Sequence, residues 1–149
     1  KLLEMEMVPP AVERQLAGNR GGAQVWVENI VDLSGDEAPP AMHRANWDSQ
    51  VARMTMFDNV IGNQGRSRAT MLRDGAWNLI LTDHSRAFGV ETELYSKMHR
   101  IDAAYWERLE RLTRKQLETV LRPWLDGDAI DAILRRRDKV RMEIKSLQR

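Results

Sequence analysis

The chain has 149 residues, of which 42% are hydrophobic and 30% charged, a balance typical of one globular domain with a buried core. Its 23 basic and 22 acidic residues leave a net charge of +1, which excludes a global electrostatic attraction to nucleic acid or to an anionic membrane. The absence of cysteine and of any long apolar stretch excludes a disulfide framework and a membrane span, so we expect a cytoplasmic protein.

Residues 1–31 carry the pattern of a β-hairpin. Two short runs typical of strands, residues 11–14 and 24–27, flank a Gly- and Asn-rich segment at residues 18–22, which predicts a turn. Pro9 and Pro10 stand at the start of the first run, where a missing backbone donor does little harm. The apolar residues before them are typical of the tail of a longer element, which suggests a fragment of a longer protein: Leu2, Leu3, Met5 and Met7.

A long helix is predicted after an irregular connection over residues 32–46, which contains a Pro-Pro pair. Asn46 is a suitable N-cap, and the helix should end at Gly62. Apolar residues recur at helical spacing between these two positions, at Trp47, Val51, Met54, Phe57 and Ile61. Asp58 lies off this apolar face, so we expect it to be solvated or to act as a cap.

A loop and a second hairpin should follow this helix. Residues 63–68 contain Gly, Ser and Asn but no apolar residue, which predicts an exposed loop. Residues 69–72 and 77–81 have the composition of strands, and Asp74 with Gly75 between them predicts the turn.

The chain is predicted to be helical from Gly89 to its end. Apolar spacing predicts helices over residues 94–98, 104–112 and 117–121, with a stop near Pro123. Asp126 or Asp128 can cap a last helix, whose end carries 7 basic and 2 acidic residues from Arg135 to Arg149 and is expected to be a solvated face. Hairpins followed by helices predict an α+β fold.

Two motifs lie at the end of the long helix and after the second hairpin. Residues 57–72 read FDNVIGNQGRSRATML, and residues 81–88 read LTDHSRAF. They resemble the motifs F-D-x-L-I-x-N-x-D-R-(H/N)-x-x-N-x-L and I-D-H-x-R-A-F of atypical kinase-like domains, of the phosphatidylinositol 3/4-kinase-related and HipA-type bacterial kind. The resemblance implies a kinase-like C-terminal lobe, in which a helix leads into the catalytic loop and a hairpin then presents a metal-binding aspartate.

The chain departs from this family at the positions that carry chemistry. The family's catalytic aspartate, which accepts the proton of the attacking hydroxyl, is Gly65 in this chain, and Ser67 replaces the His or Asn after D-R. The family's metal-binding asparagine is Thr70, whose single neutral oxygen is a poor ligand for a hard cation. The resemblance therefore implies that no catalytic residue is retained.

The resemblance also assigns binding roles. The implied cofactor is ATP with Mg²⁺ or Mn²⁺, held through Asp83 and Thr70 as metal ligands. The implied nucleotide contacts are a hinge for adenine, a leucine beneath the ring and two loop residues, namely Val27, Glu28, Asn29, Leu72, Asn63 and Arg66. From residue chemistry alone, Asp83 caps a turn, the two loop residues satisfy nearby backbone groups, and His84 is structural.

On this resemblance, residues 1–31 are the remnant of an upper lobe with its hinge, residues 32–46 a connection, and residues 47–149 the lower lobe. The leading hypothesis is a degenerate kinase-like domain, or pseudokinase, that binds a nucleotide or a protein partner. One alternative is an atypical phosphotransferase acting on protein or on a lipid-like alcohol. Another is a structural or partner-binding helical domain, whose incomplete upper lobe is covered by another chain or by self-association.

Overall fold

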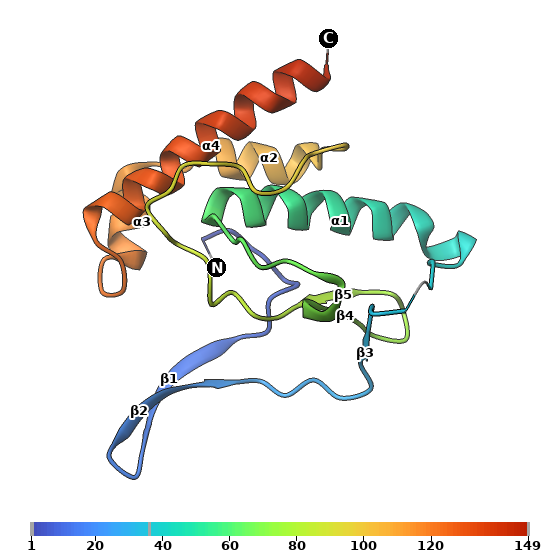
Figure 1. Ribbon diagram of the computed structural model, residues 1–149, viewed down its shortest axis with the longest axis horizontal. Coiled ribbons are helices and arrows are strands. Elements are labelled where there is room, and N and C mark those ends of the chain that lie inside the picture. Colours follow the sequence, from blue (N-terminus) through green and yellow to red (C-terminus); the bar gives the residue numbers. More distant parts are fainter. Residues whose placement is uncertain (1, 36, 149) are drawn as a thin grey trace.

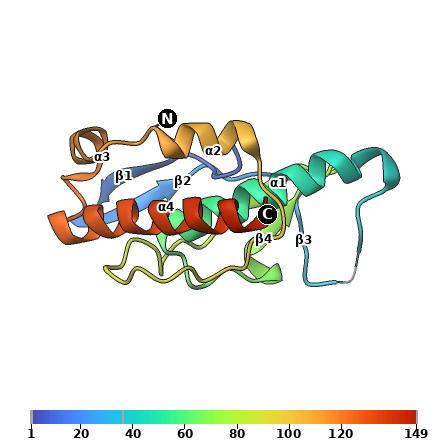
Figure 2. The same ribbon diagram turned by 90° about the horizontal axis from the view of Figure 1, so that it is seen from above.

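The computed structural model describes residues 2–35 and 37–148, so Arg149 of the predicted basic helix lies outside the described residues. Within them, four α-helices and two small antiparallel sheets form the α+β fold that the sequence predicts. Figure 1 shows the helices together on one side of the three-stranded sheet, with the β1–β2 hairpin projecting from the other side. The view from above shows α4 running alongside the end of α1 (Figure 2).

The projecting hairpin consists of β1 (Ala11–Leu16) and β2 (Asn19–Gln24), paired antiparallel with Leu16 opposite Asn19. The predicted second strand at residues 24–27 is wrong, because the chain turns earlier. Ala17 and Gly18 have φ of 49° and 83°, which suits a two-residue turn of the type that matches strand twist. Every residue of both strands is exposed.

Helix α1 (Ala41–Ile61) starts before the predicted cap at Asn46, directly after Pro40, so the irregular connection is shorter than expected. It ends as predicted at Gly62, whose φ of 70° lets its N–H donate to the backbone oxygen of Asn59. The last turns of α1 are buried on every side, and this buried stretch comprises Met56, Phe57, Asp58, Asn59, Val60 and Ile61.

The three-stranded sheet contains β3 (Val31–Asp32), β4 (Met71–Arg73) and β5 (Leu79–Leu81), in the order β3-β4-β5. A short 3₁₀ helix (Arg68–Thr70) leads into β4. The predicted turn between β4 and β5 is confirmed, because Asp74 Oδ1 accepts the N–H groups of Ala76 and Asn78 at 2.9 and 2.8 Å.

The C-terminal part contains α2 (Ala103–Glu110), α3 (Arg114–Leu121) and α4 (Gly127–Leu147), each with a side-chain cap at Asp102, Thr113 and Asp126 respectively. The predicted helix over residues 94–98 is wrong, since this segment is irregular. The side-chain amide of Asn59 donates to the backbone oxygen of Ser96 at 2.7 Å and accepts the Ser96 N–H at 2.9 Å. These two bonds satisfy backbone groups of Ser96 that a helix would otherwise pair.

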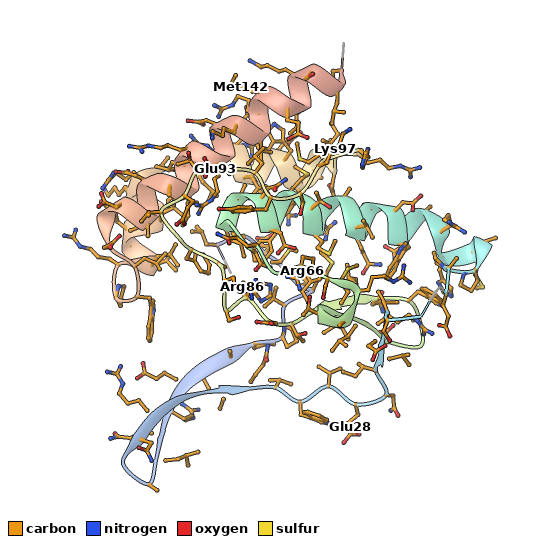
Figure 3. The ribbon with its side chains drawn as sticks, viewed as in Figure 1. Glu28, Arg66, Arg86, Glu93, Lys97 and Met142 are labelled. Carbon is orange, nitrogen blue, oxygen red and sulfur yellow. The ribbon has the colours of Figure 1, made fainter. Side chains whose placement is uncertain are left out.

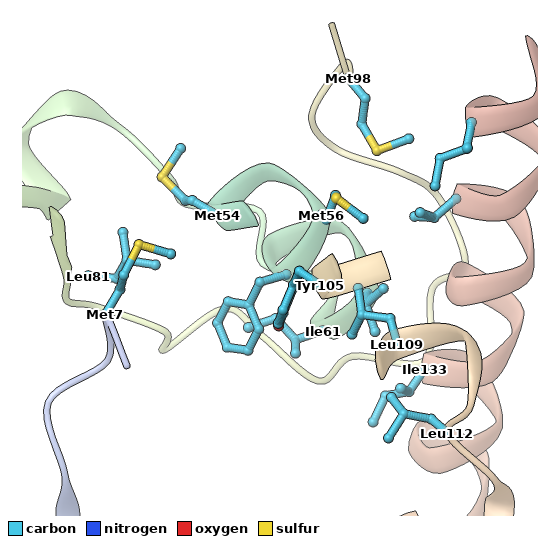
Figure 4. Close-up of a cluster of buried hydrophobic side chains, with 14 of the residues drawn as sticks. Met7, Met54, Met56, Ile61, Leu81, Met98, Tyr105, Leu109, Leu112 and Ile133 are labelled. Atoms are coloured by element: carbon cyan, nitrogen blue, oxygen red, sulfur yellow. The ribbon is translucent and has the colours of Figure 1, made fainter. Parts of the chain in front are cut away.

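The core lies between α1, α4 and the sheet (Figure 4). Four methionines are buried in it: Met7, Met54, Met56 and Met98. Met7 reaches the sheet through its backbone oxygen, which accepts the Leu81 N–H at 2.8 Å. None of the helices within the described residues is long and apolar enough to cross a membrane.

Candidate functional site

A buried ion pair organises the loop between α1 and β4. Arg66 Nε and Nη2 lie 2.7 and 3.0 Å from the two carboxylate oxygens of Asp58, and these side chains are 6% and 1% exposed. Nη1 donates to the backbone oxygens of Thr70 and Thr82, and Nη2 lies 2.9 Å from His84 Nε2. All five N–H donors of the guanidinium group therefore have partners. Figure 3 labels Arg66 beneath helix α1.

Asp58 lies in the interior, so the prediction that it is solvated is wrong. Asn63 is also buried, so the loop over residues 63–68 is only partly the exposed loop that was predicted. The last turns of α1 are buried on every side, so a residue such as Asp58 is buried even though it lies off the apolar face of the helix. Asn63 donates from Nδ2 to Asp58 Oδ1 at 3.1 Å and from its backbone N–H to Asp58 O at 2.8 Å. In this arrangement, the donors of Asn63 and Arg66 serve the loop itself.

His84 has the structural role expected from its residue chemistry. A guanidinium N–H can only donate, so the bond from Arg66 requires an unprotonated Nε2, and the ring proton is on Nδ1. Burial, and then the positive charge of Arg66, lower the pKa of His84 below 6.5. The ring also packs edge-on against Phe57, with 5.7 Å between ring centroids. The neutral imidazole, on the segment after β5, thus belongs to the network beneath the loop.

Gly65 stands where the resemblance implies a catalytic aspartate, and the space beside it is open. A Cβ atom at Gly65 would meet only Arg86 Cδ at 3.5 Å, Asn63 Oδ1 at 3.9 Å and Arg86 Cγ at 4.0 Å, all ordinary contacts. The backbone N–H of Gly65 donates to Asn63 Oδ1 at 3.4 Å. The loop shape therefore does not require glycine at this position.

Arg86 is the charged side chain that borders this space. It is exposed, and within residues 2–35 and 37–148 no ion pair or hydrogen bond engages its guanidinium group. Arg66 and Arg86 thus differ sharply, although both labels lie close together in Figure 3. All N–H donors of Arg66 are hydrogen-bonded within the protein, whereas those of Arg86 face solvent.

Thr70, a predicted metal ligand, uses its hydroxyl group to close the 3₁₀ turn. Its Oγ1 accepts from the Ser67 N–H and donates to the Ser67 backbone oxygen, both at 3.1 Å. This capping arrangement employs the hydroxyl in both directions and fixes the start of β4.

Asp83, the other predicted metal ligand, is exposed after the end of β5 and has a φ of 53°. Its Oδ1 accepts from Ser85 Oγ at 2.6 Å and from the Ser85 N–H at 3.3 Å. These hydrogen bonds are the largest cause of the lowered pKa of the Asp83 carboxyl. The contacts are those of an aspartate capping a turn, which was the reading from residue chemistry alone.

Asp83 and Thr70 are the residues that would hold the implied divalent cation. In nucleotide sites, Mg²⁺ keeps several waters and is bound through one or two carboxylates or hydroxyl groups together with the phosphates of the substrate. Within the described part of the chain, no group of three or more His, Asp or Glu side chains could hold a metal ion. Asp83 offers one carboxylate, whose Oδ1 accepts from Ser85, and Thr70 offers one hydroxyl oxygen, which is hydrogen-bonded to Ser67.

The predicted hinge residues lie on the segment between β2 and β3, where Figure 3 labels Glu28. Val27 is half-buried, whereas Glu28 and Asn29 are exposed. Across the described residues, no hydrogen bond joins these three to the loop at 63–70. Leu72 lies in β4 opposite Asp32 and Ile80, so the sheet ties it to the chain just after the hinge segment.

Arg136 is a buried residue that sequence reasoning placed on a solvated basic face, and this prediction is wrong. It is 0% exposed and donates from Nε to Val60 O at 3.0 Å and from Nη1 to the backbone oxygens of Gly89 and Glu91. It thus joins the end of α1 to the segment after Asp83. The sequence did contain a signal for this burial, because Arg136 lies three residues after Ile133 and four before Val140, on the apolar face of α4.

Comparison of the chain with known protein families and with curated proteins finds no match.

Proposed function

We propose that this chain is a degenerate kinase-like domain that binds a nucleotide and does not transfer phosphate efficiently. The proposal combines the two sequence motifs with the loop geometry. The loop that would carry the catalytic base is rigidly held, yet Gly65 supplies no group that can accept a proton.

The single observation that carries the proposal is the contrast between the buried network and Gly65. Asp58, Arg66 and His84 are joined at hydrogen-bonding distance beneath the loop. This network shapes the loop without occupying the exposed position beside it. A binding surface is therefore supported, while the group needed for chemistry is missing.

Incubation with labelled ATP, Mg²⁺ or Mn²⁺ and generic acceptors tests the absence of transfer, and calorimetric titration with ATP tests binding. We expect binding with negligible transfer. Robust transfer that persists in Gly65→Ala but is lost in Asp83→Ala would overturn the proposal. It would favour instead an atypical phosphotransferase acting on protein or a lipid-like alcohol, since positioning and charge neutralisation supply much of such catalysis.

A partner-binding function is a second proposal, favoured by the β1–β2 hairpin. An isolated two-stranded hairpin is marginally stable in water, yet both strands here are fully exposed. Leu16 and Trp26 are 75% and 84% exposed, which places apolar surface in water. Light scattering with size-exclusion chromatography tests self-association, and a clean monomer at high concentration would count against coverage by a second copy.

A further inference from the structure

We infer that the free edge of strand β1 binds an extended acidic segment of a partner protein, which adds to the hairpin as a third strand. This inference rests on the partner-binding function proposed above and is independent of nucleotide binding. It names the edge that the partner occupies and the chemistry of the segment that fits there.

The backbone groups of β1 alternate in direction. The Val25 N–H donates to Pro10 O at 3.0 Å, which makes these opposite residues a hydrogen-bonded pair of the antiparallel ladder. Such pairs alternate with pairs that are not hydrogen-bonded, so Ala11, Glu13 and Gln15 turn their backbone N–H and C=O groups away from β2. A row of outward donors and acceptors is a template that another extended strand matches.

This edge of the hairpin is uncovered. Every residue of β1 is exposed, and Figure 1 shows the hairpin projecting away from the helices. Within residues 2–35 and 37–148, one hydrogen bond reaches the outward groups, from Arg14 Nη1 to Glu13 O at 3.3 Å. The six residues of β1 include no proline or lysine, which are common obstacles to strand addition. The edge of β2 is the poorer template, because Gly21 and Gly22 weaken a strand.

The charges of β1 disfavour a second copy of the chain as the added strand. A two-fold axis that places two copies of β1 side by side in one sheet keeps each side chain on its own face, so only residues of the same face can lie opposite one another. The two registers with the largest overlap then place Glu13 opposite Glu13, or Arg14 opposite Arg14. Like charges directly opposite each other are destabilising. A different chain therefore fits this edge better.

The face that carries Arg14 sets the chemistry of the partner. Val12, Arg14 and Leu16 share this face, because side chains alternate along a strand. Val12 and Leu16 are 49% and 75% exposed, and across the part of the chain that the structure describes, no carboxylate pairs with Arg14. Glu13, on the opposite face, is already paired with Arg20 at 2.5 Å. The matching strand has an acidic residue opposite Arg14 and apolar residues two positions before and after it.

NMR titration of the isotope-labelled whole chain with two synthetic peptides tests the inference. The acidic probe is acetylated and amidated Thr-Val-Thr-Glu-Thr-Val-Thr, and its control carries Lys in place of Glu. We expect the backbone amide signals of Glu13 and Gln15 to shift, and the acidic peptide to bind roughly fivefold more tightly than the Lys peptide. Arg14→Gln should remove this preference, whereas Arg44→Gln, at an exposed position of α1, is the matched control and should retain it.

Removal of backbone donors separates strand addition from side-chain contacts. In the paired peptide, the N–H groups of the two Thr that flank Glu point towards β1, and those of the two Val point away. Methylation of these two Thr nitrogens should weaken binding at least about tenfold, while methylation of the two Val nitrogens should have little effect. In the protein, Gln15→Pro removes one outward N–H at an edge position that tolerates proline, and should bind roughly tenfold more weakly than Gln15→Ala.

Binding that tolerates methylation of both Thr nitrogens, equal binding of the acidic and Lys peptides, or shifts confined to β2 would overturn the inference. Absence of binding by either peptide would overturn it as well. In that case, a dimer in light scattering would leave the partner-binding function standing with a second copy as partner. A clean monomer that binds neither peptide would overturn that function too.

Discussion

Substitution of Asp58 by Asn probes the network that holds the loop. The change preserves the shape of the side chain and removes its charge. Asp58 accepts two hydrogen bonds from Arg66 and one from the Asn63 side chain, and both charged partners are almost fully buried. Without the carboxylate, the Arg66 guanidinium stays in the interior with no counter-ion.

The expected cost follows from this burial. Removal of one partner of a buried ion pair costs about 3–5 kcal/mol, because the other charge is left uncompensated. We expect about 3 kcal/mol for Asp58→Asn, since the amide oxygen still accepts one hydrogen bond. In a chain of 149 residues, that corresponds to a fall in melting temperature of roughly 6–12 °C.

Urea unfolding followed by tryptophan fluorescence measures this loss. Glu13→Gln is the matched control, because Glu13 pairs with Arg20 on the exposed hairpin and such pairs contribute about 0–1 kcal/mol. Arg66→Met should also destabilise the chain, and the double substitution should cost less than the sum of the two. An Asp58→Asn variant within about 1 kcal/mol of the wild type would refute the reasoning, because it would mean the charge is not buried in solution.

Further substitutions test the surrounding structure. Gly62→Ala would place a Cβ 2.7 Å from Arg136 Cζ at a φ of 70°, and should cost about 2 kcal/mol in urea unfolding, whereas Gly75→Ala meets nothing within 4 Å and should cost far less. Asp126→Ala removes the cap of α4 and should lower the free energy of unfolding by about 1 kcal/mol. Because the pKa of His84 is lowered, the unfolded chain binds more protons below pH 6.5, so the stability present above pH 6.5 should fall as the pH drops towards the lowered pKa. In His84→Gln, the urea midpoint of unfolding should therefore decline less between pH 6.5 and lower pH than it does in the wild type.

Features set by neighbouring residues were predictable from the sequence. The αL end of α1 at Gly62, the turn at Asp74 and the cap of α4 at Asp126 all depend on hydrogen bonds within a few residues. The start of α1 was misplaced because its N-terminus has no side-chain cap to mark it. Local chemistry therefore fixed these three positions, whereas the start of α1 carries no such local signal.

The candidate site was less predictable because its contacts join distant segments. Asp58 was expected to be solvated or to act as a cap because it lies off the apolar spacing of α1, but the end of that helix is enclosed on all sides. Arg136 bonds to Val60, which is 76 positions away along the chain. A period in the sequence indicates which face of a helix is apolar, and it carries no information on how many other segments cover the helix.

The residues that shape the loop are different from the position at which the resemblance implies a catalytic residue. The shaping contacts lie beneath the loop, between Asp58, Arg66 and His84, whereas Gly65 contributes one long backbone hydrogen bond of 3.4 Å. A carboxylate at Gly65 would project into open space beside Arg86 and would add no support to the loop. The folded shape of the loop therefore does not depend on a carboxylate at this position. The proposed absence of efficient transfer and the proposed binding of a nucleotide are compatible for this physical reason.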